Sequence, residues 1–414
     1  YEIPYEKIGI LNIEIISDTE RKNLINLLDN YNLWGTKSSY SYKAKNKLIL
    51  ERYKNRLSSI FYMLLESNVI SDKVESVVSA VNNSEVKKYL FAQAICDICN
   101  FKLRGYEIAY ISGSDYSEIE KALLSKDLKE IFIRSTDDIE LRSSIFSQYL
   151  IKEKSDYKTL SDILTHMYKY AYNLKGIESE NVRKKLISRS NLIEVFGGKR
   201  GNSNWKQRDK EIYDFYSSIQ NNAKKNPFFW LQYAITALNL KYYVDAKIYF
   251  NNAYSYATEL DNFDSFQLDT HYARFLLEEL INCDENFEFK KFTKAHRLLM
   301  DSSNAEIKLS YVLRQVGIYK EINKKYKEDF AVDERLKFIG DVKEVIAKFN
   351  EYFAAVEKKK KQTFYFAAEK SVRKPYKNFR KLLFDIIPIE DIIELDKRYN
   401  HLVAKNYRVE VGVC

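Results

Sequence analysis

The sequence is poor in the residues that form turns, with four prolines and eleven glycines among 414 residues. Because all-β folds need many turns, this scarcity excludes an ordinary sandwich or barrel and favours long helices. No apolar run approaches the ~20 residues that span a bilayer, and no basic segment followed by an apolar one marks a secretory signal. We therefore expect a mainly α-helical protein that lies in the cytoplasm and has no membrane partner.

Cysteine is also scarce. The chain has only four cysteines, Cys96, Cys99, Cys283 and Cys414. Four are too few to cross-link so long a chain, which excludes a disulfide scaffold and favours a reducing compartment. Cys96 and Cys99 have the spacing of metal ligands, but they fall inside the helix predicted for AQAICDICNF. No second CxxC and no nearby histidine completes a set of four ligands. We interpret the two as a buried thiol pair and predict no metal site.

Signatures of catalysis are missing from the sequence as well. The stretch 197–203, GGKRGNS, does not have the G-x4-G-K-[ST] spacing of a phosphate-binding loop, and this motif occurs nowhere in the chain. The histidines at 166, 271, 296 and 401 stand in no H-E-x-x-H or G-x-S-x-G context. The paired acidic residues fall in predicted turns and helix ends, where carboxylates are ordinarily solvated. The sequence thus predicts no catalytic residue and no cofactor bound by this chain.

Positive charge is concentrated in one stretch. The net charge is +9, and residues 353–381 alone hold ten Lys or Arg against two Glu. A cationic stripe at helical spacing is formed by Lys370, Arg373, Lys374, Lys377 and Lys381, and Phe and Tyr residues interleave with it. Cations for phosphates and rings for stacking favour nucleic-acid binding. The other interpretation is the solvated face of an ordinary amphipathic helix, and both stay open.

The N-terminal part of the chain predicts two helical subdomains. Residues 1–82 read as a run of helices with a strand-like start. Residues 83–155 predict three helices, two short strands at 130–134 and 139–141, and a further helix. Helix, helix, helix, hairpin is the order of a winged helix. The third helix is acidic at its N-terminal end, which favours a protein-protein spacer over DNA reading.

Residues 156–325 predict paired helices, and 226–277 carries the clearest pattern. Two predicted helices, at 227–240 and 243–259, each place large aromatic residues and small residues on one face. These residues are Trp230, Tyr233 and Ala234 on the first helix and Ala246, Phe250 and Ala253 on the second. The spacing matches a tetratricopeptide (TPR) unit, in which small residues let two helix axes approach closely. We expect an irregular TPR-like superhelix, followed at 326–414 by a helical region with the basic stretch.

Several of these segments together resemble a known family. The stretches NPFFWLQYAITAL, DAKIYFNNAYSYA and DTHYARFLLEE resemble the C-terminal halves of bacterial STAND P-loop NTPases, signalling ATPases with helical-repeat sensors, many of which act in antiphage defence. Upstream, YEIPYEKIGILNIEIISDTERKNLINLLDNYNLWG resembles the end of the NTPase core running into the helical lid, and KYLFAQAICDICNFKLRGYEIAYISG resembles the winged-helix domain. The resemblance covers residues 1–300 and rests on apolar spacing.

The resemblance implies a regulatory and sensing role. In the family an NTPase core that holds ATP and Mg²⁺ and an N-terminal effector precede such segments, so we expect this chain to be a fragment of a longer, homo-oligomeric protein. Its trigger would be a foreign (phage) protein. Family members often carry a histidine after the wing, whereas 141–145 here read LRSSI. This departure counts against a nucleotide contact from that domain.

The TPR register also predicts a partner-binding groove. Its lining would be Leu231, Ile235 and Asn239 from one helix and Gln267, Thr270 and Arg274 from the next. If further helices cover the groove, the apolar residues of this set belong to the core instead. A nucleic-acid-binding repeat protein that uses 358–381 is the alternative function. Charge reversal at Lys374 and Lys377 is expected to spare protein recognition, which Arg274→Glu is expected to abolish, and nucleic-acid binding is expected to respond the opposite way.

Overall fold

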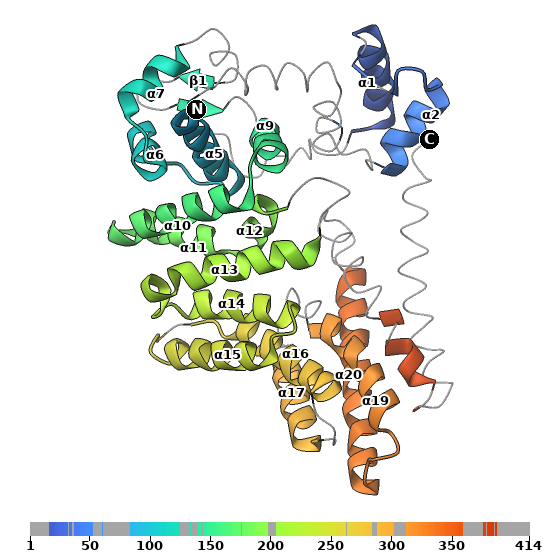
Figure 1. Ribbon diagram of the computed structural model, residues 1–414. Coiled ribbons are helices and arrows are strands. Elements are labelled where there is room, and N and C mark those ends of the chain that lie inside the picture. The colour runs from blue at the N-terminus through green and yellow to red at the C-terminus, as the bar shows by residue number, and fades with distance from the viewer. Residues whose placement is uncertain are drawn as a thin grey trace, which may run out of the picture. The chain divides into compact units, whose positions relative to one another are not determined.

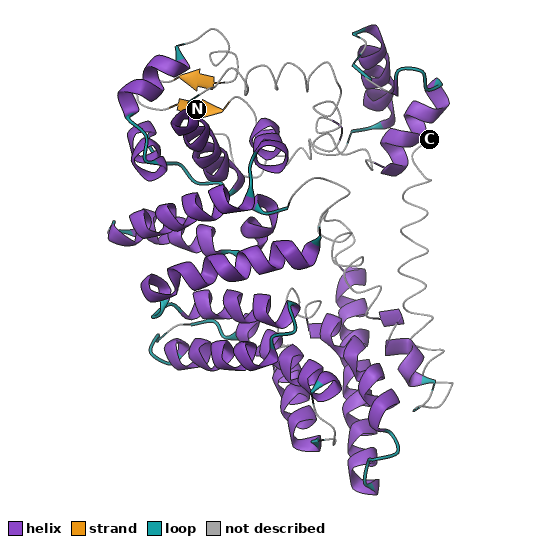
Figure 2. Ribbon diagram, in the orientation of Figure 1, coloured by secondary structure: helices purple, strands orange, loops and turns teal. Residues whose placement is uncertain are grey.

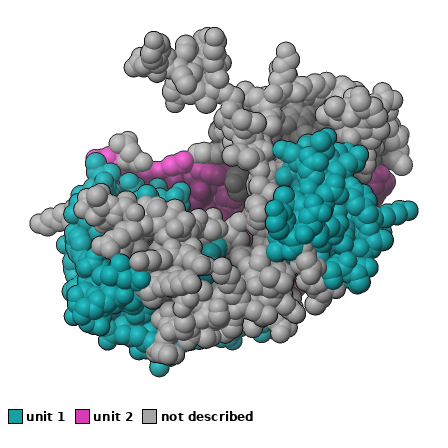
Figure 3. Space-filling model, turned by 90° about the horizontal axis from the view of Figure 1, so that it is seen from above, with its two compact units in different colours: residues 1–223 teal, residues 224–414 magenta. Residues whose placement is uncertain are grey.

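The structure is a computed structural model that is mainly α-helical over the residues it describes, which confirms the predicted fold class (Figures 1 and 2). Described are residues 16–31, 33–34, 37–52, 60, 83–124, 132–134, 139–141, 144–174, 176–197, 204–261, 263–283, 288–301, 312–358, 376–377, 379–384 and 386. The chain divides into two compact units, 1–223 and 224–414 (Figure 3). This boundary falls inside the predicted repeat range 156–325, and the four-part division stays a prediction.

The first described segment of unit 1 is a small helical subdomain. Helix α1 (Asp18–Asn30) begins with a capping box, in which Ser17 and Glu20 each accept a backbone N–H of the other. α2 (Tyr42–Lys47) and the π-helical turn Leu48–Arg52 follow. Its core consists of Ile16, Ile25, Leu28, Trp34, Ile49 and Ile60. Residues 1–15 of the predicted strand-like start and residues 61–82 of the predicted run of helices lie outside the described residues.

The second segment of unit 1 has the element order that the sequence predicts for a winged helix. It runs α5 (Ser84–Ile98), α6 (Gly105–Ser112), α7 (Tyr116–Leu123), β1 (Phe132–Arg134), β2 (Ile139–Leu141) and α9 (Ser144–Tyr149). The two strands pair antiparallel, with Ile133 opposite Glu140. Residues 89–96 of α5 are all buried, and α5 packs against α6, α7, β2 and α9, so it is the central helix of this segment.

The described part of unit 1 continues with four more α-helices. They are α10 (Tyr157–Asn173), α11 (Ile177–Ile187), α12 (Arg189–Val195) and α13 (Trp205–Ala223), and the π-helical turn Leu150–Lys154 precedes them. The sequence predicts one helix over 178–195, but the backbone breaks at Ser188, which is extended. The Tyr216 hydroxyl donates to the carbonyl of Ile187, 2.8 Å away, so a contact from α13 satisfies the end of α11.

Unit 2 begins with two helical hairpins. They are α14 (Pro227–Asn239) with α15 (Tyr243–Ala257), and α16 (Phe266–Asn282) with α17 (Phe289–Asp301). α14 starts with proline in its first turn, and the Asn226 side chain accepts from the N–H groups of Phe228 and Phe229. α16 packs on both α15 and α14. Consecutive helices therefore stack side by side, as successive units of a repeat array do.

The described segments that follow α17 in unit 2 include helices that pack against α16 and α17. A 3₁₀ turn at Val316–Ile318 leads into α19 (Tyr319–Tyr326), and α20 (Val332–Lys358) follows. Phe338 of α20 lies 5.0 Å from Phe292 of α17 between ring centroids, and Phe349 packs on Tyr376 and Phe379. Residues 387–414, the end of the predicted C-terminal region, lie outside the described residues. Among the helices that are described, none combines the length and the apolar character needed to cross a bilayer.

Candidate functional site

The residues predicted to pack the repeats are all buried in unit 2. They are Trp230, Tyr233, Ala234, Ala246, Phe250 and Ala253. The Trp230 indole N–H donates to the carbonyl of Lys224 at 2.6 Å, and the Tyr233 and Tyr249 rings stack with centroids 4.0 Å apart. Phe250 of α15 also packs against α16, because its ring centroid lies 5.6 Å from that of Phe275. Aromatic rings thus join α14 to α15 and α15 to α16.

Only some of the residues predicted to line the partner-binding groove lie at the surface of the structure. Leu231, Ile235 and Thr270 are buried, at 1%, 8% and 2% exposure, so the prediction that they line an open groove is wrong for these three. The physical reason is that the helix packing closes over the apolar face of α14 and over the Thr270 side chain, which donates to the carbonyl of Phe266. Gln267, in the first turn of α16, is exposed and remains available to a partner.

The other two groove residues are brought together. Arg274 donates to Asn239 at 3.1 Å and to Glu278 at 2.6 Å, and its side chain is about three-quarters buried. Burial, the nearby Glu278 carboxylate and the Cys283 thiol raise the pKa of the adjacent Tyr243 to about 12. Arg274 therefore ties α16 to the end of α14. Arg274→Glu would break this internal link, so it is not a clean probe of partner binding.

The basic stretch is described only at its end. Lys370, Arg373 and Lys374 lie outside the described residues, whereas Lys377 and Lys381 are exposed, four residues apart. Tyr376 and Phe379 are fully buried against Phe349, which contradicts the idea that these two rings stack on bases. What is described of the stretch matches the solvated face of an amphipathic segment.

The Cys96–Cys99 pair lies in the core of unit 1. Both thiols are buried, and burial raises the pKa of Cys96 well above its usual value and that of Cys99 to about 12. Because the thiolate is the form that binds metal and reacts with electrophiles, both thiols are in their inert form.

We expect a thiol reagent to label native Cys283, which is exposed, and to spare Cys96 and Cys99. Raising the pH from 7 to 9 leaves the pair unlabelled, since at pH 9 a thiol with a pKa of about 12 is ionised to only about one part in a thousand. Mass spectrometry after labelling, with and without denaturant, measures this. Rapid labelling of Cys96 in the native protein would contradict the buried placement.

A surface depression of about 590 Å³ lies on unit 1, between α6 and α10. Its ionisable lining residues are Lys88, Asp162, His166 and Lys169, all exposed. Tyr170 also faces it and donates to Glu107 at 2.8 Å. Solvated cations of this kind attract anions only weakly.

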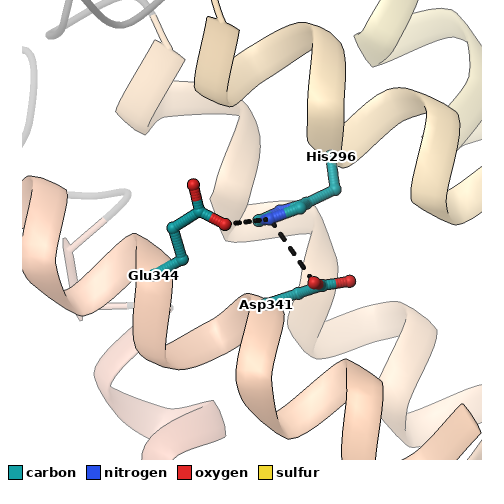
Figure 4. A group of neighbouring side chains, drawn as sticks. All are labelled: His296, Asp341 and Glu344. Carbon is teal, nitrogen blue, oxygen red and sulfur yellow. Dashed lines mark hydrogen bonds and ion pairs between the residues drawn. The ribbon is translucent and has the colours of Figure 1, made fainter.

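One group of potential metal-ligating side chains lies on α17 and α20, and the sequence does not predict it. His296, Asp341 and Glu344 each offer a ligand atom, and these atoms lie within 4.8 Å of one another; among the described residues, no other group of this kind was found. Figure 4 shows the imidazole between the two carboxylates. The His296 Nε2 atom is 3.1 Å from Glu344 Oε2 and 3.7 Å from Asp341 Oδ1.

Burial makes this group electrostatically unusual. The His296 and Asp341 side chains are 6% and 14% exposed, whereas Glu344 is half-exposed. Desolvation raises the pKa of Asp341, although the positive charges of His296 and Lys337 act in the opposite direction. Imidazole and carboxylate are also the ligands that divalent cations take, so the group can either form a buried ion pair or hold a metal.

Sequence reasoning missed this group because its members are far apart in the chain. Glu344 follows His296 by 48 residues, and only the packing of α17 on α20 brings them together. One signal was present: Asp341 and Glu344 have the i, i+3 spacing that places two carboxylates on one face of a helix.

Comparisons with family models, with curated proteins and with solved structures gave no match to this chain.

Proposed function

We propose that this chain is the regulatory, ligand-sensing half of a STAND-type signalling NTPase in antiviral defence. The observation that supports it best is the pair of stacked hairpins α14–α15 and α16–α17, joined by buried aromatic and small residues. The helix, helix, helix, hairpin, helix order of α5 to α9 precedes them in the chain, as the resemblance implies. ATP and Mg²⁺ would belong to the NTPase core and not to this chain.

A helical stack suits protein recognition for a physical reason. Each helical pair contacts only its neighbours, so the array presents a long surface without needing a closed pocket. Gln267, exposed in the first turn of α16, lies on this surface. For a trigger protein to switch anything, it must bind one arrangement of the parent protein better than the other. Its binding would then release the NTPase for oligomerisation.

The alternative is a nucleic-acid-binding repeat protein. It is supported by the exposed Lys377 and Lys381, and it is weakened by the burial of Tyr376 and Phe379. Binding through such cations alone would recognise phosphates without reading bases. It would also weaken steeply as the salt concentration rises.

To test this proposal, the natural gene, with whatever coding sequence precedes Tyr1, is expressed in a bacterial host. The host is then challenged with a panel of phages. We expect the gene to lower plating of some phages, and Gln267→Glu to reduce that protection by about 10-fold or more, since a new charge in an interface costs more than about 1 kcal/mol. The double variant Lys377→Glu, Lys381→Glu is expected to keep full protection.

Two outcomes would count against the sensor proposal. One is a natural gene that protects against no phage in the panel. The other is the reverse pattern, in which the lysine variant loses protection and Gln267→Glu keeps it. That pattern, together with salt-sensitive RNA or DNA binding by the purified chain, favours the nucleic-acid alternative.

A further inference from the structure

We propose that His296, Asp341 and Glu344 form a binding site for a divalent transition-metal cation that bridges α17 and α20. The site lies within unit 2 and does not depend on the sensor function. One imidazole nitrogen and two carboxylates are a donor set typical of Zn²⁺ and its neighbours in the first transition row. Ca²⁺ and Mg²⁺ prefer oxygen ligands alone and fit this set poorly.

The distances match a coordinated cation. Ligand atoms about 2.0–2.2 Å from a tetrahedral metal lie about 3.3–3.6 Å from one another. The Nε2 atom of His296 lies 3.1 Å from Glu344 Oε2 and 3.7 Å from Asp341 Oδ1, on either side of that range. These two separations would need to change by only a few tenths of an ångström, and the ligand oxygens of Asp341 and Glu344 lie within 4.8 Å of each other.

The imidazole is already held in the orientation that such a site needs. The Nδ1 atom of His296 is 2.9 Å from the hydroxyl of Tyr319. On one face, the Phe292 ring stacks with the imidazole at an interplanar angle of 16°. At a distance of 2.9 Å, the Tyr319 hydroxyl oxygen can accept the Nδ1 proton. That arrangement directs Nε2 toward the carboxylates, and with the proton on Nδ1 the Nε2 lone pair would be available to a cation, as outer partners of metal-binding histidines arrange.

The hydrogen bonding of the Asp341 carboxylate gives independent support for a cation site. Asp341 Oδ2 is buried and has no hydrogen-bond partner. A buried carboxylate oxygen without a donor is costly, and a bound cation would compensate it. His296 and Lys337 are the positive groups that act on Asp341, and Glu344 adds a like charge. Two carboxylates facing one imidazole give the group excess negative charge, which favours a divalent ion.

The access of solvent to the site and the number of its protein ligands also fit a bound metal ion. Glu344 is half-exposed, so a cation can enter from solvent without unfolding the helices. Three protein ligands leave the fourth tetrahedral position to water or to another ligand, which is the pattern of an open site and not of a closed structural one.

The experiment titrates the EDTA-treated full chain with Zn²⁺ by isothermal titration calorimetry. We expect one equivalent to bind, and excess Mg²⁺ or Ca²⁺ not to compete. Changing partners outside the ligand shell costs about 10–100-fold in metal affinity, so removing a ligand in Glu344→Gln or Asp341→Asn is expected to cost at least about 10-fold. Co²⁺ gives a second readout, because a nitrogen-containing tetrahedral site produces visible absorption that both variants lose.

Two control variants make the result specific. Glu351→Gln, which removes an exposed carboxylate two turns along α20, should bind Zn²⁺ like the unmodified chain. Cys96→Ser should also bind normally, which excludes the buried thiol pair as the source. Glu344→Gln changes a half-exposed side chain and is expected to fold, and circular dichroism checks this for both ligand variants. No Zn²⁺ binding, or binding that survives in folded Glu344→Gln and Asp341→Asn, would overturn the proposal.

Discussion

Replacing Phe250 by alanine is expected to lower the free energy of unfolding of unit 2 by about 3–5 kcal/mol, the usual cost of removing a buried phenylalanine ring. Phe250 is fully buried on α15, and its ring touches both Tyr272 and Phe275 of α16. The substitution therefore leaves a cavity at the contact between the two hairpins. The same contact joins α15 to α16, so the loss should be large.

The measurement is urea denaturation followed by Trp230 fluorescence in a Trp34→Phe, Trp205→Phe background, so that the signal comes from unit 2 alone. Val244→Ala is the matched control. Val244 lies on the same helix but is 75% exposed, and we expect its loss to change the free energy of unfolding by less than about 0.5 kcal/mol. Similar effects for the two variants would mean that α15 does not pack on α16 through Phe250.

In unit 1, Asp209→Asn is expected to lower the free energy of unfolding by about 3–5 kcal/mol, because it removes one partner of a buried ion pair. Asp209 is 2% exposed and lies 2.7 Å from Arg189 of α12 and 3.0 Å from Arg208. The Arg189 side chain is itself 17% exposed, so its charge would remain largely desolvated without its carboxylate. Losing this pair also loosens α12 from α13.

Asp214→Asn is the control for this variant, since Asp214 is on the same helix and pairs with Lys210 at 2.9 Å. Both members of that pair are about half-exposed, and such pairs contribute about 0.5 kcal/mol or less. Chemical denaturation followed by circular dichroism compares the two variants. Equal effects would contradict the buried placement of Asp209.

The helices themselves are well predicted from the sequence. The α14 and α15 segments, predicted at 227–240 and 243–259, are found at Pro227–Asn239 and Tyr243–Ala257. The strands predicted at 130–134 and 139–141 are found at Phe132–Arg134 and Ile139–Leu141. Local signals explain this success: an Asn-Pro start, period-3.6 apolar residues and polar turns each act over a few residues.

What the sequence did not predict depends on contacts between distant residues. The break at Ser188 depends on a hydrogen bond from Tyr216, which lies 29 residues further along the chain from Ile187. Leu231 and Thr270 have the periodicity of a groove, and only the packed structure shows that they are covered. The His296 group is the extreme case, because its three residues belong to no local motif. Tertiary packing thus decided both the candidate groove and the candidate metal site.

Sequencing the natural gene upstream of Tyr1, together with the intact mass of the natural polypeptide, is the most direct test that this chain is the sensor half of a STAND NTPase. We expect an upstream G-x4-G-K-[ST] motif in the same reading frame and a mass well above the 49.0 kDa of this chain. A start codon within a few residues of Tyr1, with an intact mass close to that of this chain, would contradict the proposal.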